Sequence, residues 1–153
     1  MARRLLRSIA LGTFDSVAWH PVAADKAATH IGLFLTWAIT GDLIHQAHLE
    51  DPSSAWYIAR IKARERTARD FLADMCRNRL SDRDLAHEAC EFAATYYSER
   101  YLHDYARVFA EVPYLYDVDD TWDNADRLAV ILDRRFAQYR RWRAASADRR
   151  VLP

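Results

Sequence analysis

The sequence predicts an all-α fold, a single-domain bundle of about six helices around a buried central helix at residues ~25–40. The chain of 153 residues has only three Gly and four Pro, too few for the many turns of a sandwich or barrel. Hydrophobic residues make up 51% and charged residues 29%, the balance of a globular chain. A domain of this length can bury roughly 70% of its unfolded surface, so it needs no disulfide staples.

The central helix lies in the most apolar stretch, residues 28–43. Its apolar positions follow helical spacing at Ile31, Phe34, Leu35, Ala38 and Ile39. The small residues Thr29, Gly32, Thr36 and Thr40 form a narrow stripe on the same helix. A helix that is apolar nearly all round belongs in the middle of a bundle, and Gly32 would let a neighbouring helix approach closely.

Capping signals mark the starts of further helices. They lie at Asp51 with Pro52, at Thr67-x-x-Asp70, at Ser81-x-x-Asp84 and at Thr121, which begins the last and longest helix. We therefore expect a loose basic start and an aromatic-pinned loop over residues 1–23, an all-helical domain over 24–145 and a tail over 146–153. The cysteines, Cys76 and Cys90, lack C-x-x-C spacing and are expected to be reduced.

Several function classes are disfavoured. The net charge is zero, so nucleic acid is not an expected partner. No stretch approaches the ~20 apolar residues of a membrane span, and the apolar patch in the opening MARRLLRSIALG is too short for the core of a secretory signal. We expect a cytoplasmic protein. The sequence contains no P-loop, no G-x-G-x-x-G and no complete catalytic motif, so no cofactor and no catalytic residue is predicted.

Histidines supply the weaker candidates. His30 opens the central helix, and we interpret it as a structural residue whose ring hydrogen-bonds the segment from Asp15 to His20, which also holds Trp19. A catalytic role would require a nearby nucleophile or carboxylate.

A metal site is a second weak possibility. His45 and His48 form H-x-x-H, which can share a metal on one helix face. Zinc needs three or four ligands, however, and Glu50 and Asp51 complete the set poorly. We therefore expect His45 and His48 to face solvent without a metal.

The segment 111–126, EVPYLYDVDDTWDNAD, is the strongest local anomaly because acids alternate with aromatic residues. Carboxylates steer a basic partner and aromatic side chains anchor it. The candidate partner-binding residues are Tyr114, Tyr116, Asp117, Asp119, Asp120, Trp122 and Asp123. The alternative is a solvated loop whose aromatics enter the core and whose acids cap the last helix.

Three segments resemble a bacterial family of small stand-alone proteins built on a domain of unknown function. They are THIGLFLTWAI at residues 29–39, YYSERYLHDY at 96–105 and VDDTWDN at 118–124. The resemblance spans about residues 14–142. It implies no catalytic residues and is loosely associated with immunity proteins encoded beside polymorphic toxins.

Two functions follow as hypotheses. In the first, the protein is a cytoplasmic immunity protein that occludes a cognate toxin with a basic surface through the segment 111–126. In the second, it is a metal-dependent or His/Asp-dependent hydrolase that reverses a toxin's modification, using Asp15, His20, His30 and the acids near Asp119. An assembly role through dimerisation of the last helix is a third possibility.

Overall fold

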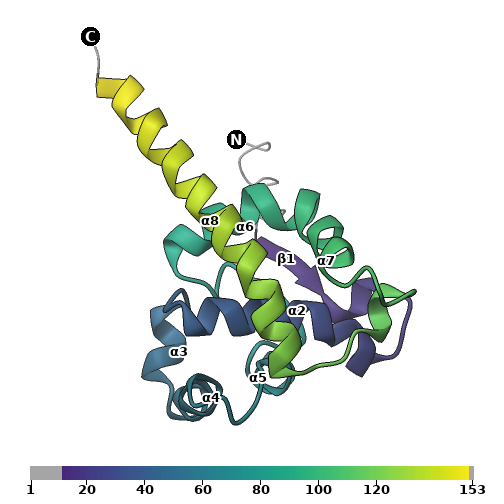
Figure 1. Cartoon of the computed structure of the whole chain (residues 1–153). Helices are drawn as coiled ribbons and strands as arrows, with labels where there is room; N and C mark the ends of the chain where they lie inside the picture. Colours follow the sequence, from purple (N-terminus) through teal and green to yellow (C-terminus); the bar gives the residue numbers. More distant parts are fainter. Residues whose placement is uncertain (1–11, 152–153) are drawn as a thin grey trace, which may run out of the picture.

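A computed structural model describes residues 12–151 of the chain, with side chains described to residue 149 (Figure 1). The elements, in order, are β1 (Thr13–Ser16), η1 (Val17–Trp19), α2 (Ala24–Thr40), α3 (Gln46–Glu50), α4 (Pro52–Lys62), α5 (Arg69–Met75), β2 (Arg79–Ser81), α6 (His87–Tyr96), η2 (Tyr97–Tyr101), α7 (Leu102–Val108), η3 (Leu115–Asp117) and α8 (Trp122–Val151). The predicted all-α class is confirmed, with one small two-stranded sheet added. The basic start of the predicted segment 1–23 lies largely outside the described residues.

Helix α2 is the centre of the fold, as the sequence predicts. Every residue from 27 to 39 is buried. The helices α4, α5 and α8 all pack against it, and α8 crosses it in Figure 1. The Trp37 indole N–H donates to Asp133 Oδ1 of α8 at 2.8 Å, so the polar atom of this large side chain has a hydrogen-bond partner.

The small-residue stripe of α2 receives the start of α5. A Cβ added at Gly32 would lie 3.0 Å from the Arg69 Cα, so only glycine allows this approach. One turn further on, the Thr36 hydroxyl accepts the Ala68 backbone N–H at 2.9 Å and donates to the Gly32 carbonyl at 2.8 Å. The expected close approach of a helix at Gly32 is therefore confirmed.

The strand β1 is a feature that the sequence did not predict, since residues 13–16 were expected to form a loop. It pairs antiparallel with β2, with Asp15 opposite Leu80 and Ser16 opposite Arg79. The register is irregular between Thr13 and Asp15. Irregularities of this kind re-aim a side chain out of the ordinary alternation, and Asp15 is only 4% exposed.

The predicted helix starts are partly right. Asp51 caps α4 by accepting the Ser54 N–H at 2.9 Å, with Pro52 at the first turn, and Thr121 accepts the Asn124 N–H at the start of α8. The two predicted capping boxes are wrong. The N-cap residues of α5 and α6 are Ala68 and Ala86, neither of which has a side-chain cap.

The misassigned residues make tertiary contacts and turn contacts instead. The Thr67 hydroxyl donates to Asp120 at 2.7 Å, 53 positions further along the chain. Asp84 Oδ2 accepts both the N–H and the hydroxyl of Ser81, which closes the turn before α6.

The helices α6 and α7 are joined without a loop by the π-helical segment η2. Single π turns inside helices occur often at functional sites. Here the segment places Tyr97 and Tyr101 in the core, followed by Tyr105 one turn later, all at most 4% exposed. Their hydroxyl groups are carried toward the N-terminal half of α2.

The last helix is longer than expected. The sequence predicts a domain ending near residue 145, but α8 continues to Val151, and its C-terminal part extends beyond the other elements in Figure 1. Within the described residues, none of the helices combines the length and the apolar character that crossing a bilayer demands.

Candidate functional site

The Asp15 carboxylate is the centre of a buried polar cluster. Its Oδ1 accepts the Ser16 backbone N–H at 2.8 Å and lies 2.7 Å from His20 Nε2. Its Oδ2 lies 3.0 Å from His30 Nε2 and accepts the Tyr97 hydroxyl at 2.7 Å. A carboxylate offers about four acceptor sites, so these four donors saturate Asp15.

His20 extends the cluster toward the surface. Its Nε2 donates to Asp15, so in the neutral ring Nδ1 is an acceptor, and it lies 2.7 Å from the Tyr116 hydroxyl. In this tautomer, the Tyr116 hydroxyl donates to His20 Nδ1, and His20 Nε2 donates to Asp15. The His20 side chain is 10% exposed, and its ring packs edge-on against both His30 and Tyr116.

His30 lies deeper, with a side chain that is 1% exposed. Its backbone carbonyl accepts the Tyr101 hydroxyl, and its ring lies edge-on to Tyr105. Among residues 12–149, His30 Nδ1 has no hydrogen-bond partner. An acceptor without a partner is tolerated better than a buried N–H without one, so Nδ1 carries no proton and Nε2 donates to Asp15.

The electrostatics agree with this proton assignment. Burial would raise the pKa of Asp15, but hydrogen bonds from His30, Tyr97 and His20 outweigh it and hold that pKa below its ordinary value. Burial lowers the pKa of His30 by more than the nearby Asp15 raises it. At neutral pH the cluster therefore holds an ionised Asp15 beside a neutral His30, with Tyr97 kept protonated because burial raises its pKa strongly.

The residues Asp15, His20 and His30 place three ligand atoms within 4.8 Å of one another, a spacing that could suit a metal ion. The ring of His30 does not fit this use. If His30 Nε2 bound a metal, its proton would sit on Nδ1, which is buried and has no acceptor in the described structure. The donor set therefore favours a hydrogen-bonded carboxylate over a metal centre.

Three of the four candidates near the N-terminus meet, and the ring of His30 bonds the segment 15–20 as the sequence predicts. Trp19 does not enter the cluster, because its side chain is 62% exposed. The acids near Asp119 also stay outside, and Tyr116 takes the place that they were expected to fill.

The acids of the segment 111–126 mostly have partners within the chain. Asp117 pairs with Lys26 at 2.6 Å, and Asp120 accepts from Thr67 and lies 3.3 Å from Arg69. Two further pairs join Glu111 to Arg127 and Asp126 to Arg64. Within residues 12–149, Asp119 and Asp123 form no ion pair.

The aromatics of this segment divide into two groups. Trp122 is partly buried, and its indole N–H donates to the Arg66 carbonyl at 3.0 Å while Arg64 lies over its ring. Tyr114 is 46% exposed and packs edge-on against Tyr116, with ring centroids 5.3 Å apart. The exposed ring therefore rests on a residue of the buried cluster.

Sequence reasoning did not assign Tyr97 or Tyr101 to this site. A signal was available, because Tyr97, Tyr101 and Tyr105 recur at i, i+4 and i+8, which places three hydroxyl groups on one helix face. No local pattern indicated that this face meets Asp15, which lies 82 residues away.

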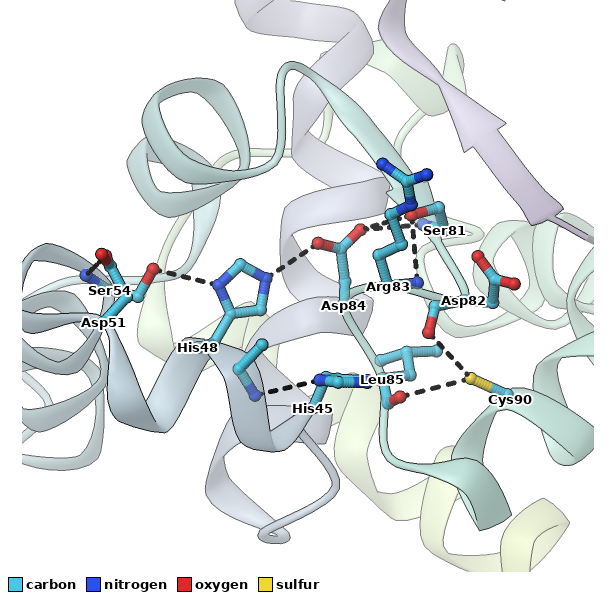
Figure 2. A network of polar contacts seen from close by, with 11 residues as sticks. His45, His48, Asp51, Ser54, Ser81, Asp82, Arg83, Asp84, Leu85 and Cys90 are labelled. Carbon is cyan, nitrogen blue, oxygen red and sulfur yellow. Dashed lines mark hydrogen bonds and ion pairs between the residues drawn. The ribbon is translucent and has the colours of Figure 1, made fainter.

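The H-x-x-H pair is separated, and the expectation that both histidines face solvent is wrong for His48. His45 caps α3 by accepting the Ala47 N–H at 3.0 Å. His48 lies between Ser54 and Asp84 in a second polar network, shown in Figure 2. Its Nε2 lies 2.9 Å from Asp84 Oδ1 and its Nδ1 lies 3.0 Å from Ser54 Oγ.

Comparison with known proteins gives a family without an assigned activity. No curated protein and no solved structure matches the chain. One family matches residues 13–118, a range that includes both polar networks and ends before α8. Because this match covers more than half of the chain, the protein belongs to the family described as Domain of unknown function (DUF7832).

Proposed function

We propose that the protein is a cytoplasmic immunity protein of the antitoxin type, which binds and occludes a cognate bacterial toxin. The observation that carries the proposal is that two exposed aromatic side chains, Trp19 and Tyr114, adjoin a hydrogen-bonded pair of polar residues. Trp19 directly precedes His20, and Tyr114 packs on Tyr116, while His20 and Tyr116 are joined at 2.7 Å. The exposed Tyr114 ring therefore rests on this hydrogen-bonded pair, and the exposed Trp19 adjoins the pair in sequence.

A rigid support of this kind beneath an exposed aromatic ring favours tight binding. Trp and Tyr are enriched among the residues that dominate interface energetics, and rigid anchors lose little conformational entropy on association. The Asp15 carboxylate fixes His20, and through it Tyr116, before any partner arrives. A standard interface buries roughly 1,600 Å² in total, so neighbouring surface must contribute as well.

Charge contributes a smaller part than the sequence suggested. Asp117 and Asp120 are already paired within the chain, which leaves Asp119 and Asp123 as the acids best placed to steer a basic partner. The aromatic side chains, Trp19 and Tyr114, supply the binding energy in this proposal, and the acids affect mainly the rate of association. The resemblance to small bacterial proteins encoded beside toxins supports the same assignment.

The test is binding to the product of the adjacent gene, measured with the full-length chain. Each anchor that dominates an interface contributes at least ~2 kcal/mol, so the Trp19→Ala/Tyr114→Ala double variant should weaken binding by more than ~100-fold. Trp142→Ala is the matched control, because Trp142 is 58% exposed but lies on α8. Equal affinities for the double variant and the control, or no binding by the wild-type protein, would contradict the proposal.

A second candidate is a hydrolase in which Asp15 and His20 supply acid–base catalysis to remove a toxin's modification. The observation in its favour is the carboxylate–imidazole pair at 2.7 Å, with His20 at the outer edge of the cluster. Here His20→Gln should abolish removal of the modification, whereas Trp19→Ala should only weaken substrate binding. If His20→Gln protects a toxin target as well as the wild type does, this candidate is rejected.

A further inference from the structure

A second cluster of metal-ligating side chains lies away from Asp15. It comprises His48 on α3, Cys76 at the end of α5 and Asp84 in the turn before α6. One ligand atom from each, an imidazole nitrogen, the thiol Sγ and a carboxylate oxygen, lies within 4.8 Å of the other two. The cluster is largely shielded from solvent, with exposed fractions of 12%, 7% and 6% respectively.

We propose that His48, Cys76 and Asp84 form a binding site for a zinc ion. Thiolate sulfur, imidazole nitrogen and carboxylate oxygen are the three ligand types that zinc takes in proteins. With bonds of about 2.0–2.3 Å, a tetrahedral zinc ion separates its ligand atoms by roughly 3.3–3.6 Å. His48 Nε2 and Asp84 Oδ1 are 2.9 Å apart, so a separation of less than 1 Å more would admit the ion.

The surroundings hold two of the ligands in the orientation that a metal requires. Asp84 Oδ2 is occupied by the Ser81 N–H and hydroxyl at 2.9 and 3.1 Å, which leaves Oδ1 facing His48 (Figure 2). His48 Nδ1 is paired with Ser54 Oγ on the far side of the ring, and the ring is flanked by Phe71. Partners of this kind orient ligands in established metal sites.

The proton balance is also satisfied. Without metal, a neutral His48 donates from Nε2 to Asp84 and accepts the Ser54 hydroxyl at Nδ1. When zinc binds, the imidazole proton is held on Nδ1 and donated to Ser54 Oγ, since a hydroxyl can accept as well as donate. The Cys76 thiol loses one proton to solvent as the S–Zn bond forms.

An acceptor for the proton on Nδ1 is what distinguishes the cluster at His48 from the cluster at Asp15. His48 has a partner, Ser54, that accepts the displaced proton, whereas His30 has none among the described residues. Three protein ligands leave a fourth position for water or another small ligand, as in zinc sites that are open to exchange. The site does not depend on the proposed toxin-binding surface, because it shares no residue with it.

Cobalt(II) is the probe that tests the site, because a cobalt–thiolate bond gives a charge-transfer absorption that nitrogen and oxygen ligands do not. Titration of the full-length reduced protein should give one Co²⁺ per chain with this band, and Zn²⁺ should displace it. Cys76→Ser should abolish the band, and Cys90→Ser is the control that should retain it. A wild-type protein without the band, or a band lost with Cys90→Ser and kept with Cys76→Ser, would overturn the proposal.

A stability measurement covers the case in which Cys76→Ser does not fold. Zn²⁺ in excess over its Kd should raise the Tm of the wild type, since an ion that binds only the folded state stabilises it. Asp84→Asn and His48→Gln should each reduce this shift and weaken cobalt uptake by at least ~10-fold, the effect of losing a ligand or its support. Unchanged uptake by both variants would also overturn the proposal.

Discussion

At the scale of single residues, Asp15 is stabilised as a buried anion, and no Arg or Lys of residues 12–149 pairs with it. Its four donors are one backbone N–H, one tyrosine hydroxyl and two imidazole N–H groups. Hydrogen bonds to a charged acceptor are roughly twice as strong as those between neutral groups, which offsets the cost of burial. The same carboxylate joins β1 to His20 after η1, to α2 and to η2, so one side chain ties this strand to the helical body.

The neutral state of His30 gives a pH dependence. Because burial lowers the pKa of His30 below its ordinary 6.5, the unfolded chain takes up a proton before the folded chain does as the pH falls. Stability is therefore fully present above pH 6.5 and falls below it, by up to about 1.4 kcal/mol per pH unit for this one group. Urea denaturation at pH 7 and at pH 5 measures the loss.

His30→Gln is the variant that isolates this effect, because an amide can still donate to Asp15 but does not titrate. It should be less stable than the wild type at pH 7 and should lose less on going to pH 5. Asp15 does not interfere in this range, since its lowered pKa places its own loss of stability below pH 3.8. A His30→Gln variant with the same pH dependence as the wild type would exclude His30 as the source.

At the scale of elements, the close contact between α2 and α5 depends on the absence of a Cβ at Gly32. Ala favours a helix interior over Gly by about 1 kcal/mol, so helix propensity alone predicts that Gly32→Ala stabilises the protein. The Cβ would, however, lie 3.0 Å from backbone of Arg69, which cannot move without shifting α5. Overpacking of this kind costs about 1–3 kcal/mol, so we expect a net loss of stability.

Thermal unfolding checks this prediction, with Gly12→Ala as the control. A Cβ at Gly12 would meet nothing within 4 Å, so that variant should change stability by no more than about 0.5 kcal/mol. A Gly32→Ala protein as stable as the wild type would mean that α5 can move away at little cost.

The same scale shows what sequence could and could not predict. The central helix and the caps at Asp51 and Thr121 were predictable, because periodicity and capping act within a few residues. The pairing of β1 with β2 joins segments more than 60 residues apart, and no local signal specifies it. Thr67 was misread as a cap because its hydroxyl bonds Asp120, a partner that only the folded chain supplies.

Separation in sequence also decides which contacts of the two polar clusters could be predicted. His30 and the segment 15–20 are close in sequence, so their meeting could be expected. The bonds from Asp15 to Tyr97 and from His48 to Asp84 connect residues 82 and 36 positions apart. A search for closely spaced ligands therefore selected His45 with His48 and missed Asp84, because metal-ligand and catalytic sets are brought together by tertiary structure.

At the scale of the whole molecule, α8 lies beyond the part of the chain that matches the family and still covers its core. Leu128, Leu132 and Phe136 face inward and are buried. The polar contacts that fix the helix differ in kind. Arg135 reaches Asp104 of α7 with two nitrogens at 2.8 and 3.0 Å, and Asp104 is only 3% exposed. Arg140 makes a similar pair with Glu88 of α6 at 2.8 and 3.1 Å, but in solvent.

This difference predicts unequal costs for two otherwise matched variants. Arg135→Ala leaves the Asp104 carboxylate buried, with Tyr96 as its remaining side-chain donor, and removing one partner of a buried pair costs about 3–5 kcal/mol. Arg140→Ala breaks a bidentate pair whose members are 57% and 45% exposed, and exposed pairs contribute about 0–1 kcal/mol. Urea unfolding of both variants at neutral pH measures the difference. Equal destabilisation by Arg140→Ala and Arg135→Ala would contradict the prediction. It would mean that the burial of Asp104 does not set how strongly the Arg135 contact holds α8 on the domain.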